Sequence, residues 1–207
     1  MKDFRLYAIT GEQFHPGRAM LHVMEQAILG GADIIQLRDK KGSKAEVLAK
    51  AQALRKLTRR YGVTFIVNDD IDIALEADAD GVHLGQGDLP LPEARKRMGG
   101  KVIGISTHAI EEALLAQEQG ADYIGVGPVF PTKTKENVTP VTVDYVREVS
   151  RRIAIPFVAI GGIKLHNVDE VIRAGARRIC AVSEIVGSDD VKGTCEAFIR
   201  KLEKGGA

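Results

Sequence analysis

The sequence predicts an α/β fold, a compact (βα)8 barrel formed by a single domain over residues 1–207. Short runs rich in Val, Ile and Leu recur eight times, and each is followed by a longer amphipathic segment, as in repeated βα units. Most of these runs are continuously apolar instead of alternating, which is typical of strands buried on both faces of a parallel sheet.

The predicted strands, in chain order, are residues 5–10, 34–38, 64–68, 81–84, 102–106, 123–127, 157–161 and 179–183. The predicted helices that alternate with them are residues 17–29, 44–61, 71–76, 91–98, 110–119, 143–152, 167–174 and 190–204. One face of the segment 44–61 carries Val47, Ala51, Leu54 and Leu57 at helical spacing. This apolar face is expected to pack on the sheet.

A weak internal repeat supports the same fold. The triplets Gly-Ala-Asp at 31–33, Asp-Ala-Asp at 78–80, Gly-Ala-Asp at 120–122 and Gly-Ala-Arg at 175–177 each lie just before an even-numbered strand. Three of them open with glycine after a helix, where a left-handed cap is favoured. Eight evenly spaced units close more naturally into a TIM barrel than into an open doubly wound sheet, which remains the alternative.

Composition excludes several classes of protein. With Lys+Arg 29 and Asp+Glu 28, the chain lacks the basic excess expected of a nucleic-acid partner. Two cysteines without CxxC spacing cannot form a disulfide framework. No segment approaches the roughly 18 apolar residues of a membrane span, and residues 1–10 lack the pattern of a signal peptide. We therefore expect a cytoplasmic protein with no nucleic-acid or membrane partner, and leave open a homo-oligomer.

In such a barrel the active site lies at the carboxyl ends of the strands. At the end of the second strand, period-two alternation puts Gln36, Arg38 and Lys40 on the same side. Two cations and an amide facing one way suit a phosphate or diphosphate. The alternative is a solvated strand end with surface ion pairs, which a buried strand makes less favourable.

Two aspartates follow the next strands. Asp69 and Asp88 end neighbouring strands, and Mg²⁺ takes one or two carboxylates together with substrate phosphates. This placement predicts a magnesium site. The alternative is that each aspartate caps a helix, since Asp69 precedes one and Asp88 precedes Pro90.

A second anion site is expected on the far side of the barrel. Gly161 and Gly162 follow the seventh strand, and Ser183 ends the eighth, where many barrels bind phosphate through backbone N–H groups. The segment 132–135, with two hydroxyls and two ammonium groups, could close over a phosphate. The alternatives are glycines of a tight turn and a solvated loop.

The candidate acids or bases are His83 and His108. His83 lies on a buried strand and is expected to be a hydrogen-bonded core histidine, whereas His108 begins a helix and is expected in a cap. The sequence contains no Ser-His-Asp arrangement, Schiff-base lysine or zinc spacing. These observations favour catalysis by anion stabilisation.

Taken together, these motifs resemble the thiamine phosphate synthase family. The resemblance is carried by residues 36–40 (QLRDK), 68–70 (NDD), 81–88 (GVHLGQGD), 104–108 (GISTH), 125–135, 160–163 (IGGI) and 182–183 (VS). Members join hydroxymethylpyrimidine diphosphate to thiazole phosphate, releasing diphosphate and forming thiamine phosphate. The resemblance therefore implies a magnesium-dependent transferase of thiamine biosynthesis.

The resemblance also implies a role for individual residues. The pyrimidine diphosphate would be bound by Gln36, Leu37, Arg38, Asp39, Lys40, Asn68, Ser106 and Lys135, of which Arg38, Lys40, Ser106 and Lys135 would be catalytic. The thiazole phosphate would be bound by Thr132, Lys133, Thr134, Gly162, Val182 and Ser183, and Mg²⁺ by Asp69 and Asp88. In the family's reaction diphosphate leaves first, which needs positioned cations at the leaving group.

Three positions depart from the family's pattern. Gly11 stands where aspartate is usual, Thr142 where glycine is frequent, and Glu184 where alanine is common. Three rival functions stay open: a thiazole tautomerase of the related barrel type, a non-catalytic barrel that binds a thiamine precursor, and a phosphate-binding isomerase or lyase. Against the first, Pro128 occupies the position where tautomerases carry a histidine.

Overall fold

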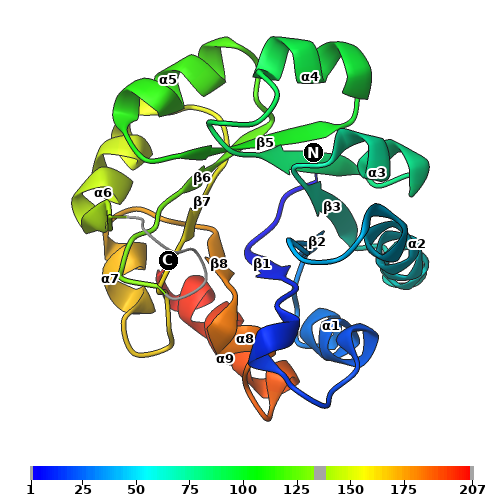
Figure 1. Cartoon of the computed structure of the whole chain (residues 1–207). Helices are drawn as coiled ribbons and strands as arrows, with labels where there is room; N and C mark the ends of the chain where they lie inside the picture. The colour runs from blue at the N-terminus through cyan, green and yellow to red at the C-terminus, as the bar shows by residue number, and fades with distance from the viewer. Residues whose placement is uncertain (1, 133–138, 206–207) are drawn as a thin grey trace.

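The computed structural model describes residues 2–132 and 139–205. Within these residues, eight parallel strands form a closed barrel in the order β1 to β8, and the helices surround it (Figure 1). Strand β1 pairs with both β2 and β8, so the sheet has no open edge. The prediction of a (βα)8 barrel is confirmed, and the open sheet is excluded.

The strands are β1 (Leu6–Ile9), β2 (Ile34–Leu37), β3 (Thr64–Asn68), β4 (Gly81–Leu84), β5 (Val102–Thr107), β6 (Tyr123–Val126), β7 (Phe157–Ile160) and β8 (Ile179–Ala181). The helices are η1 (Glu12–Phe14), α1 (Met20–Leu29), α2 (Lys44–Tyr61), α3 (Ile71–Glu76), α4 (Leu91–Met98), α5 (Ile110–Glu118), α6 (Thr142–Arg152), α7 (Val168–Arg173), α8 (Ser183–Val186) and α9 (Val191–Gly205). The expected boundaries of most elements are correct to within two residues.

Two boundaries and two short helices differ from the prediction for identifiable reasons. Helix α1 begins at Met20 and not at residue 17, because Gly17 has a left-handed φ of 78°. Strand β8 ends at Ala181, and the residues beyond it form the short helix α8. Neither α8 nor η1 was predicted, since a helix of three or four residues completes barely one turn and shows no helical period.

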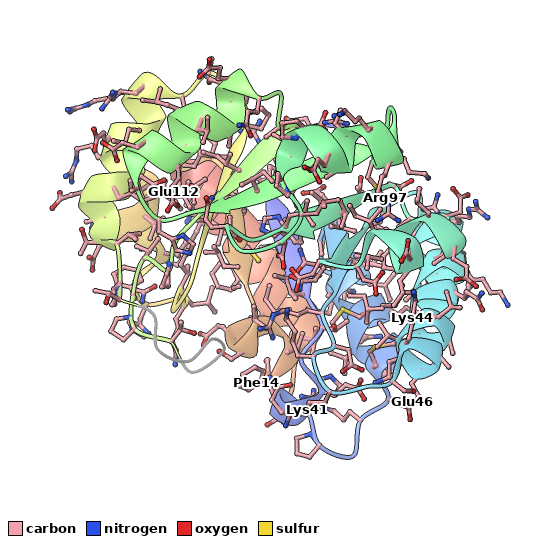
Figure 2. The ribbon with its side chains drawn as sticks, turned by 45° about the horizontal axis from the view of Figure 1, so that its top comes forward. Phe14, Lys41, Lys44, Glu46, Arg97 and Glu112 are labelled. Atoms are coloured by element: carbon pink, nitrogen blue, oxygen red, sulfur yellow. The ribbon has the colours of Figure 1, made fainter. Side chains whose placement is uncertain are left out.

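Helix α2 shows how local sequence sets an element. Ser43 and Glu46 form a capping box at its start, and Glu46 lies at the surface of the molecule (Figure 2). Gly62 ends it in the left-handed conformation, with φ 69°. Between these ends the helix buries Val47 and Leu54 against the barrel.

The repeated triplet has a structural role at the amino-terminal end of the barrel. Asp33 accepts hydrogen bonds from the backbone N–H groups of Arg5 and Leu6, at 2.7 and 3.0 Å. Asp80 and Asp122 do the same for Phe65 and Ile103, at 2.8 Å each. Each aspartate therefore satisfies a backbone N–H group of the preceding strand, which a buried sheet end requires.

The interior of the barrel is filled unevenly. Phe4 packs edge to face against Tyr7 and Tyr123, with ring centroids 6.3 and 6.0 Å apart, and the two tyrosine rings are tilted by 52° to each other. Gly104 makes room for this layer, because a Cβ there would lie 2.1 Å from the Tyr123 ring. The carboxyl-terminal half is left open, and this is where the pocket forms.

In the part of the chain that the structure describes, no helix is long and apolar enough to cross a membrane.

Candidate active site

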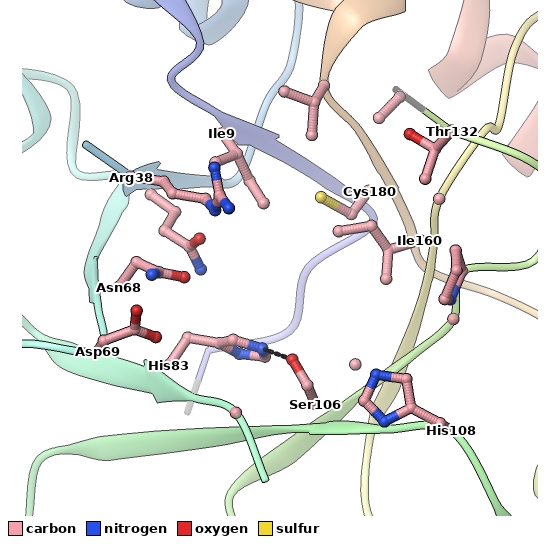
Figure 3. A pocket seen from close by; sticks show the side chains of 18 of the residues that line it. Ile9, Arg38, Asn68, Asp69, His83, Ser106, His108, Thr132, Ile160 and Cys180 are labelled. Atoms are coloured by element: carbon pink, nitrogen blue, oxygen red, sulfur yellow. Dashed lines mark hydrogen bonds between the residues drawn. The ribbon is translucent and has the colours of Figure 1, made fainter. Parts of the chain in front are cut away.

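A cavity of about 390 Å³ opens at the carboxyl ends of the strands. Of the residues predicted from the sequence, it is lined by Gln36, Arg38, Lys40, Asn68, Asp69, Asp88, Ser106, Thr132, Gly162, Val182 and Ser183. Arg38, Asn68 and Asp69 lie on one side of it, and Thr132 and Ile160 on the other (Figure 3). The cavity therefore has two walls that differ in chemistry.

The end of β2 alternates as expected, and this alternation corrects two predicted contacts. Gln36, Arg38 and Lys40 line the cavity, whereas Leu37 packs in the hydrophobic layer beneath the helices. Asp39 also points away, because its carboxylate binds Lys50 at 2.8 Å. The side chains of Leu37 and Asp39 are therefore not brought to the pocket, contrary to the prediction for the whole segment 36–40.

Arg38 is half-buried at the first wall, and its side chain lines the cavity. Its backbone is held by Thr10, whose hydroxyl accepts from the Arg38 N–H at 2.9 Å and donates to the Arg38 carbonyl at 3.2 Å. Its side chain makes no hydrogen bond or ion pair with any residue of the described ranges 2–132 and 139–205. An unpaired guanidinium with five donors is suited to an oxyanion.

Asp69 and Asp88 do not cap helices, so that alternative is wrong. Asp70 caps α3 by accepting from the Ile73 N–H at 2.9 Å, while Asp69 adopts a left-handed φ of 62° and turns into the cavity. Asp88 accepts from the backbone N–H of Gly85 at 2.7 Å, which closes the loop after β4. Both carboxylates thus remain beside the cavity.

The environment of Asp69 is that of a crowded anion. Burial raises the pKa of its carboxyl above the ordinary value; the Lys40 ammonium, which pairs with it, opposes this rise, and the neighbouring Asp88 carboxylate adds to it. Two adjacent carboxylates repel each other unless a cation lies between or beside them. Hard oxygen ligands in this arrangement fit Mg²⁺.

The ligand set is small for a metal held by protein alone. Among the described residues, no group of three or more His, Cys, Asp or Glu side chains is arranged to hold a metal ion. Mg²⁺ characteristically keeps several waters and binds through one or two carboxylates plus substrate phosphates. Asp69 and Asp88 therefore fit a metal that arrives with, or is completed by, a phosphorylated ligand.

His83 is hydrogen bonded as expected, but it also lines the cavity. Its Nδ1 lies 2.9 Å from the Tyr123 hydroxyl, and its Nε2 lies 2.9 Å from Ser106 Oγ (Figure 3). His108 also lines the cavity; its backbone N–H donates to the Glu112 carboxylate at 2.7 Å, and its Nδ1 lies 3.2 Å from the same oxygen. Sequence analysis missed Tyr123, although a tyrosine in an apolar strand signals a buried hydroxyl that needs a partner.

The opposite wall is made of backbone. Gly161 and Gly162 have left-handed φ angles of 98° and 64°, and a Cβ on either would meet the loop after β6 at 2.4–2.5 Å. These glycines therefore let the loops after β6 and β7 touch directly. Val182 and Ser183 stand at the start of α8, beside them in the cavity. Lys133, Thr134 and Lys135 lie outside the described residues.

Glu184 does not reach into the cavity. Its carboxylate accepts from the Leu165 N–H at 3.3 Å and lies 4.0 Å from the Lys164 ammonium. It ties α8 to the loop after β7. The carboxylate that departs from the family's pattern is thus turned away from the cavity lining.

Comparisons with known proteins identify the family to which the chain belongs. A family model described as thiamine monophosphate synthase matches residues 6–185. The chain is 65% identical to a thiamine-phosphate synthase of Halalkalibacterium halodurans, over 100% of this chain and 99% of the relative, and 62% identical to one of Shouchella clausii, over 99% of each. Its fold matches a thiamine phosphate pyrophosphorylase of Pyrococcus furiosus with TM-score 0.89 and 37% identity, covering 98% of this chain and 96% of that one.

Proposed function

The chain belongs to the thiamine monophosphate synthase family, and from this premise we propose how its pocket performs the family's reaction. The protein is a transferase of thiamine biosynthesis that joins hydroxymethylpyrimidine diphosphate to thiazole phosphate and releases diphosphate. Its partners are small-molecule substrates. The proposal concerns which residues act on each substrate.

The diphosphate is assigned to the wall that carries Arg38. The observation that carries this assignment is the Arg38 guanidinium, which has no side-chain partner among the described residues and lies in the same cavity as two adjacent carboxylates. Lys40 and Ser106 face the same space, and Lys135 is proposed to reach it from the segment outside the described residues. Asn68, next to them on β3, is assigned to the pyrimidine.

The family is consistent with a metal-dependent enzyme, and Asp69 and Asp88 are the proposed ligands of Mg²⁺. When bound, the ion would offset charge on the departing diphosphate. Without a cation the two carboxylates would repel the same diphosphate that Arg38 attracts. Lys40, paired with Asp69, already offsets part of this repulsion.

The thiazole phosphate is assigned to the opposite wall. The backbone at Gly162, Val182 and Ser183 lies open to the cavity without bulky side chains on the glycine side. Backbone N–H groups at the start of a helix suit a phosphate. Thr132 lies on the same side, and Lys133 and Thr134 are proposed to complete the contact.

The chemistry needs charge stabilisation and no acid or base. The bond between the pyrimidine methylene carbon and the diphosphate oxygen breaks, and both electrons leave with the oxygen. The lone pair of the thiazole nitrogen then forms a bond to the cationic methylene carbon. Arg38, Lys40, Ser106 and Lys135 stabilise the charge that develops on the leaving group, which is the largest single contribution in many enzymes.

The test is direct coupling. Purified protein is mixed with hydroxymethylpyrimidine diphosphate, thiazole phosphate and Mg²⁺, and thiamine phosphate and diphosphate are measured. We expect the two products in equal amounts, and none when either substrate is left out. If the protein instead isomerises a carboxylated thiazole phosphate precursor supplied alone, and forms no thiamine phosphate, the tautomerase alternative is correct.

A further inference from the structure

A continuous chain of hydrogen bonds crosses the interior of the barrel beneath the pocket. Gln36 Nε2 lies 2.7 Å from the Tyr7 hydroxyl, which lies 3.0 Å from the Tyr123 hydroxyl. Tyr123 lies 2.9 Å from His83 Nδ1, and His83 Nε2 lies 2.9 Å from Ser106 Oγ. The ends of the chain, Gln36 and Ser106, line the cavity, on strands that face it from different sides.

The barrel is built to seat this chain. Tyr7 and Tyr123 are 2% and 0% exposed, and Gln36 is 2% exposed. A Cβ at Gly104 would lie 2.1 Å from the Tyr123 ring, and one at Gly125 would lie 3.2 Å from His83 Cε1. Strands β5 and β6 thus carry glycine where the rings of Tyr123 and His83 need the space. Burial raises the pKa of both tyrosine hydroxyls, so each keeps its proton.

Each link of the chain has a direction. A hydroxyl has one proton to donate, and a neutral imidazole donates from one nitrogen and accepts at the other. If Gln36 Nε2 donates to Tyr7, then Tyr7 donates to Tyr123, Tyr123 donates to His83 Nδ1, and His83 Nε2 donates to Ser106. The Ser106 proton is then directed into the cavity, and Gln36 Oε1 is left as an acceptor.

The opposite direction reverses both ends together. Ser106 would donate to His83, and the order would run back to Tyr7, which would donate to Gln36 Oε1. Ser106 would then present only lone pairs to the cavity, and Gln36 would present its NH₂ group. A mixed arrangement would set two donors or two acceptors against each other in a buried site, which is costly.

We propose that Tyr7, Tyr123 and His83 are positioning residues that couple the Gln36 amide to the Ser106 hydroxyl, so that an anion bound at Ser106 leaves Gln36 Oε1 as an acceptor. Such an acceptor selects a ring that carries an amino group and rejects one that carries a carbonyl oxygen at the same place. This inference rests on the proposed function for the anion at Ser106. It moves the expected contact of Gln36 from the diphosphate to the ring.

The test compares two diphosphates in the coupling reaction, the 4-aminopyrimidine and its 4-oxo analogue. The ratio of kcat/KM for the two substrates is measured for the wild type, Tyr7→Phe and Tyr123→Phe. Each variant removes one hydroxyl and keeps the ring. We expect the wild type to prefer the amino compound, and each variant to lower that preference roughly tenfold or more, because the Gln36 amide is then free to turn over.

Tyr145→Phe is the matched control. Its hydroxyl is also hydrogen bonded in the interior, 2.8 Å from Thr107 Oγ1 and from the Ala109 carbonyl. It takes no part in the row of hydrogen bonds from Gln36 to Ser106. This variant should keep the wild-type preference. Thermal unfolding of all four proteins shows whether each is folded. If either Tyr7→Phe or Tyr123→Phe fails to fold, the other still tests the inference.

The outcomes separate this inference from the proposed function. If the wild type forms no thiamine phosphate, the proposed function fails. If the wild type couples the amino compound but does not discriminate against the oxo compound, or if folded Tyr7→Phe and Tyr123→Phe lose activity on both substrates with an unchanged ratio, the inference is overturned.

Discussion

The carboxylate of Asp39 accepts a hydrogen bond from the Lys50 ammonium at 2.8 Å and anchors the loop that carries Arg38 and Lys40. Its other oxygen accepts from the backbone N–H groups of Lys41 and Gly42 at 2.9 Å each. The side chain that sequence analysis placed in the pocket therefore shapes the loop from behind. Its effect on the site is indirect.

This relationship predicts a pH-dependent stability. Hydrogen bonding from Lys50 lowers the pKa of Asp39 to about 2, against an ordinary value of 3.8. A lowered pKa in the folded state means that the contribution is complete above the ordinary value and is lost as the pH falls toward 2. Asp39→Asn should therefore destabilise the protein near pH 6 and progressively less toward pH 3.

Urea unfolding of the wild type and Asp39→Asn across this range measures the difference. Asp144→Asn is the control, since Asp144 pairs with Arg147 at the surface and is 80% exposed. A difference between wild type and Asp39→Asn that stays constant from pH 6 to pH 3 would contradict the assigned ion pair.

Arg38→Ala should slow the coupling reaction more than it weakens the binding of thiazole phosphate. The guanidinium is proposed to act on charge that appears as diphosphate departs, and loss of one such contact costs about 3 kcal/mol, close to a hundredfold in kcat. Lys41→Ala is the control, because Lys41 is exposed at the edge of the molecule (Figure 2). Steady-state kinetics with each substrate varied measures both effects. A defect confined to the KM for thiazole phosphate would move Arg38 to the other wall.

Asp88→Asn should raise the Mg²⁺ concentration needed for half-maximal rate, by roughly tenfold or more. The amide keeps an oxygen for the Gly85 N–H and removes the charge that a metal needs. Asp70→Asn is the comparison, since Asp70 caps α3 and should leave the magnesium dependence unchanged. A magnesium titration of the coupling rate decides between them; superimposable curves for Asp88→Asn and wild type would remove Asp88 from the metal site.

Much of the fold could be predicted because it depends on patterns within short segments. Continuous apolar runs and helical periods locate the strands and most helices, and alternation places Gln36, Arg38 and Lys40 on one side of β2. The sequence also predicted that Asp69 and Asp88 lie beside one cavity, because both follow neighbouring strands; their role as metal ligands stays a prediction. The sequence could not show which aspartate caps α3, because Asp69 and Asp70 are both suitable. Only the backbone conformation shows that Asp70 caps the helix and Asp69 turns into the cavity.

The chain from Gln36 to Ser106 could not be predicted in the same way. Tyr7 and Tyr123 are 116 residues apart and meet only when the barrel closes. Both tyrosines lie in apolar strands. The hydrophobic pattern therefore predicts that they are buried in the core, and it does not predict that their hydroxyls are hydrogen bonded to each other. Helix α8 was missed because it is a single turn. The extent of the domain and the roles of Lys133, Thr134 and Lys135 stay predictions.

Thr142→Asn should stabilise the protein. Thr142 has a left-handed φ of 65°, which is unfavourable for a β-branched residue and costs on the order of 1 kcal/mol or more. Asparagine tolerates this conformation, and its side-chain oxygen can replace Thr142 Oγ1, which accepts from the Asp144 N–H at 3.3 Å. Thr139→Asn, at another exposed threonine, is the control. Denaturant unfolding should show a gain for Thr142→Asn alone, and an equal change in both variants would refute the strain.

Arg18→Gln should weaken the binding of thiazole phosphate, because α8 would be held in place less firmly. The Arg18 guanidinium donates to the carbonyls of Val186 and Ser188 at 2.8 and 2.6 Å, at the end of the helix that begins with Ser183. Hydrogen bonds from a charged group to such carbonyls contribute about 1.5–3 kcal/mol, and glutamine cannot span both. Because α8 carries one side of the proposed phosphate site, its displacement should raise the KM for thiazole phosphate roughly tenfold, which corresponds to about 1.4 kcal/mol. The KM for the pyrimidine diphosphate, which is assigned to the opposite wall, should change little. Arg152→Gln, which removes a surface pair with Glu148, is the matched control and should alter neither value. If Arg18→Gln instead raises both KM values equally, α8 does not act selectively on the phosphate of the thiazole, and the assignment of the second wall is wrong.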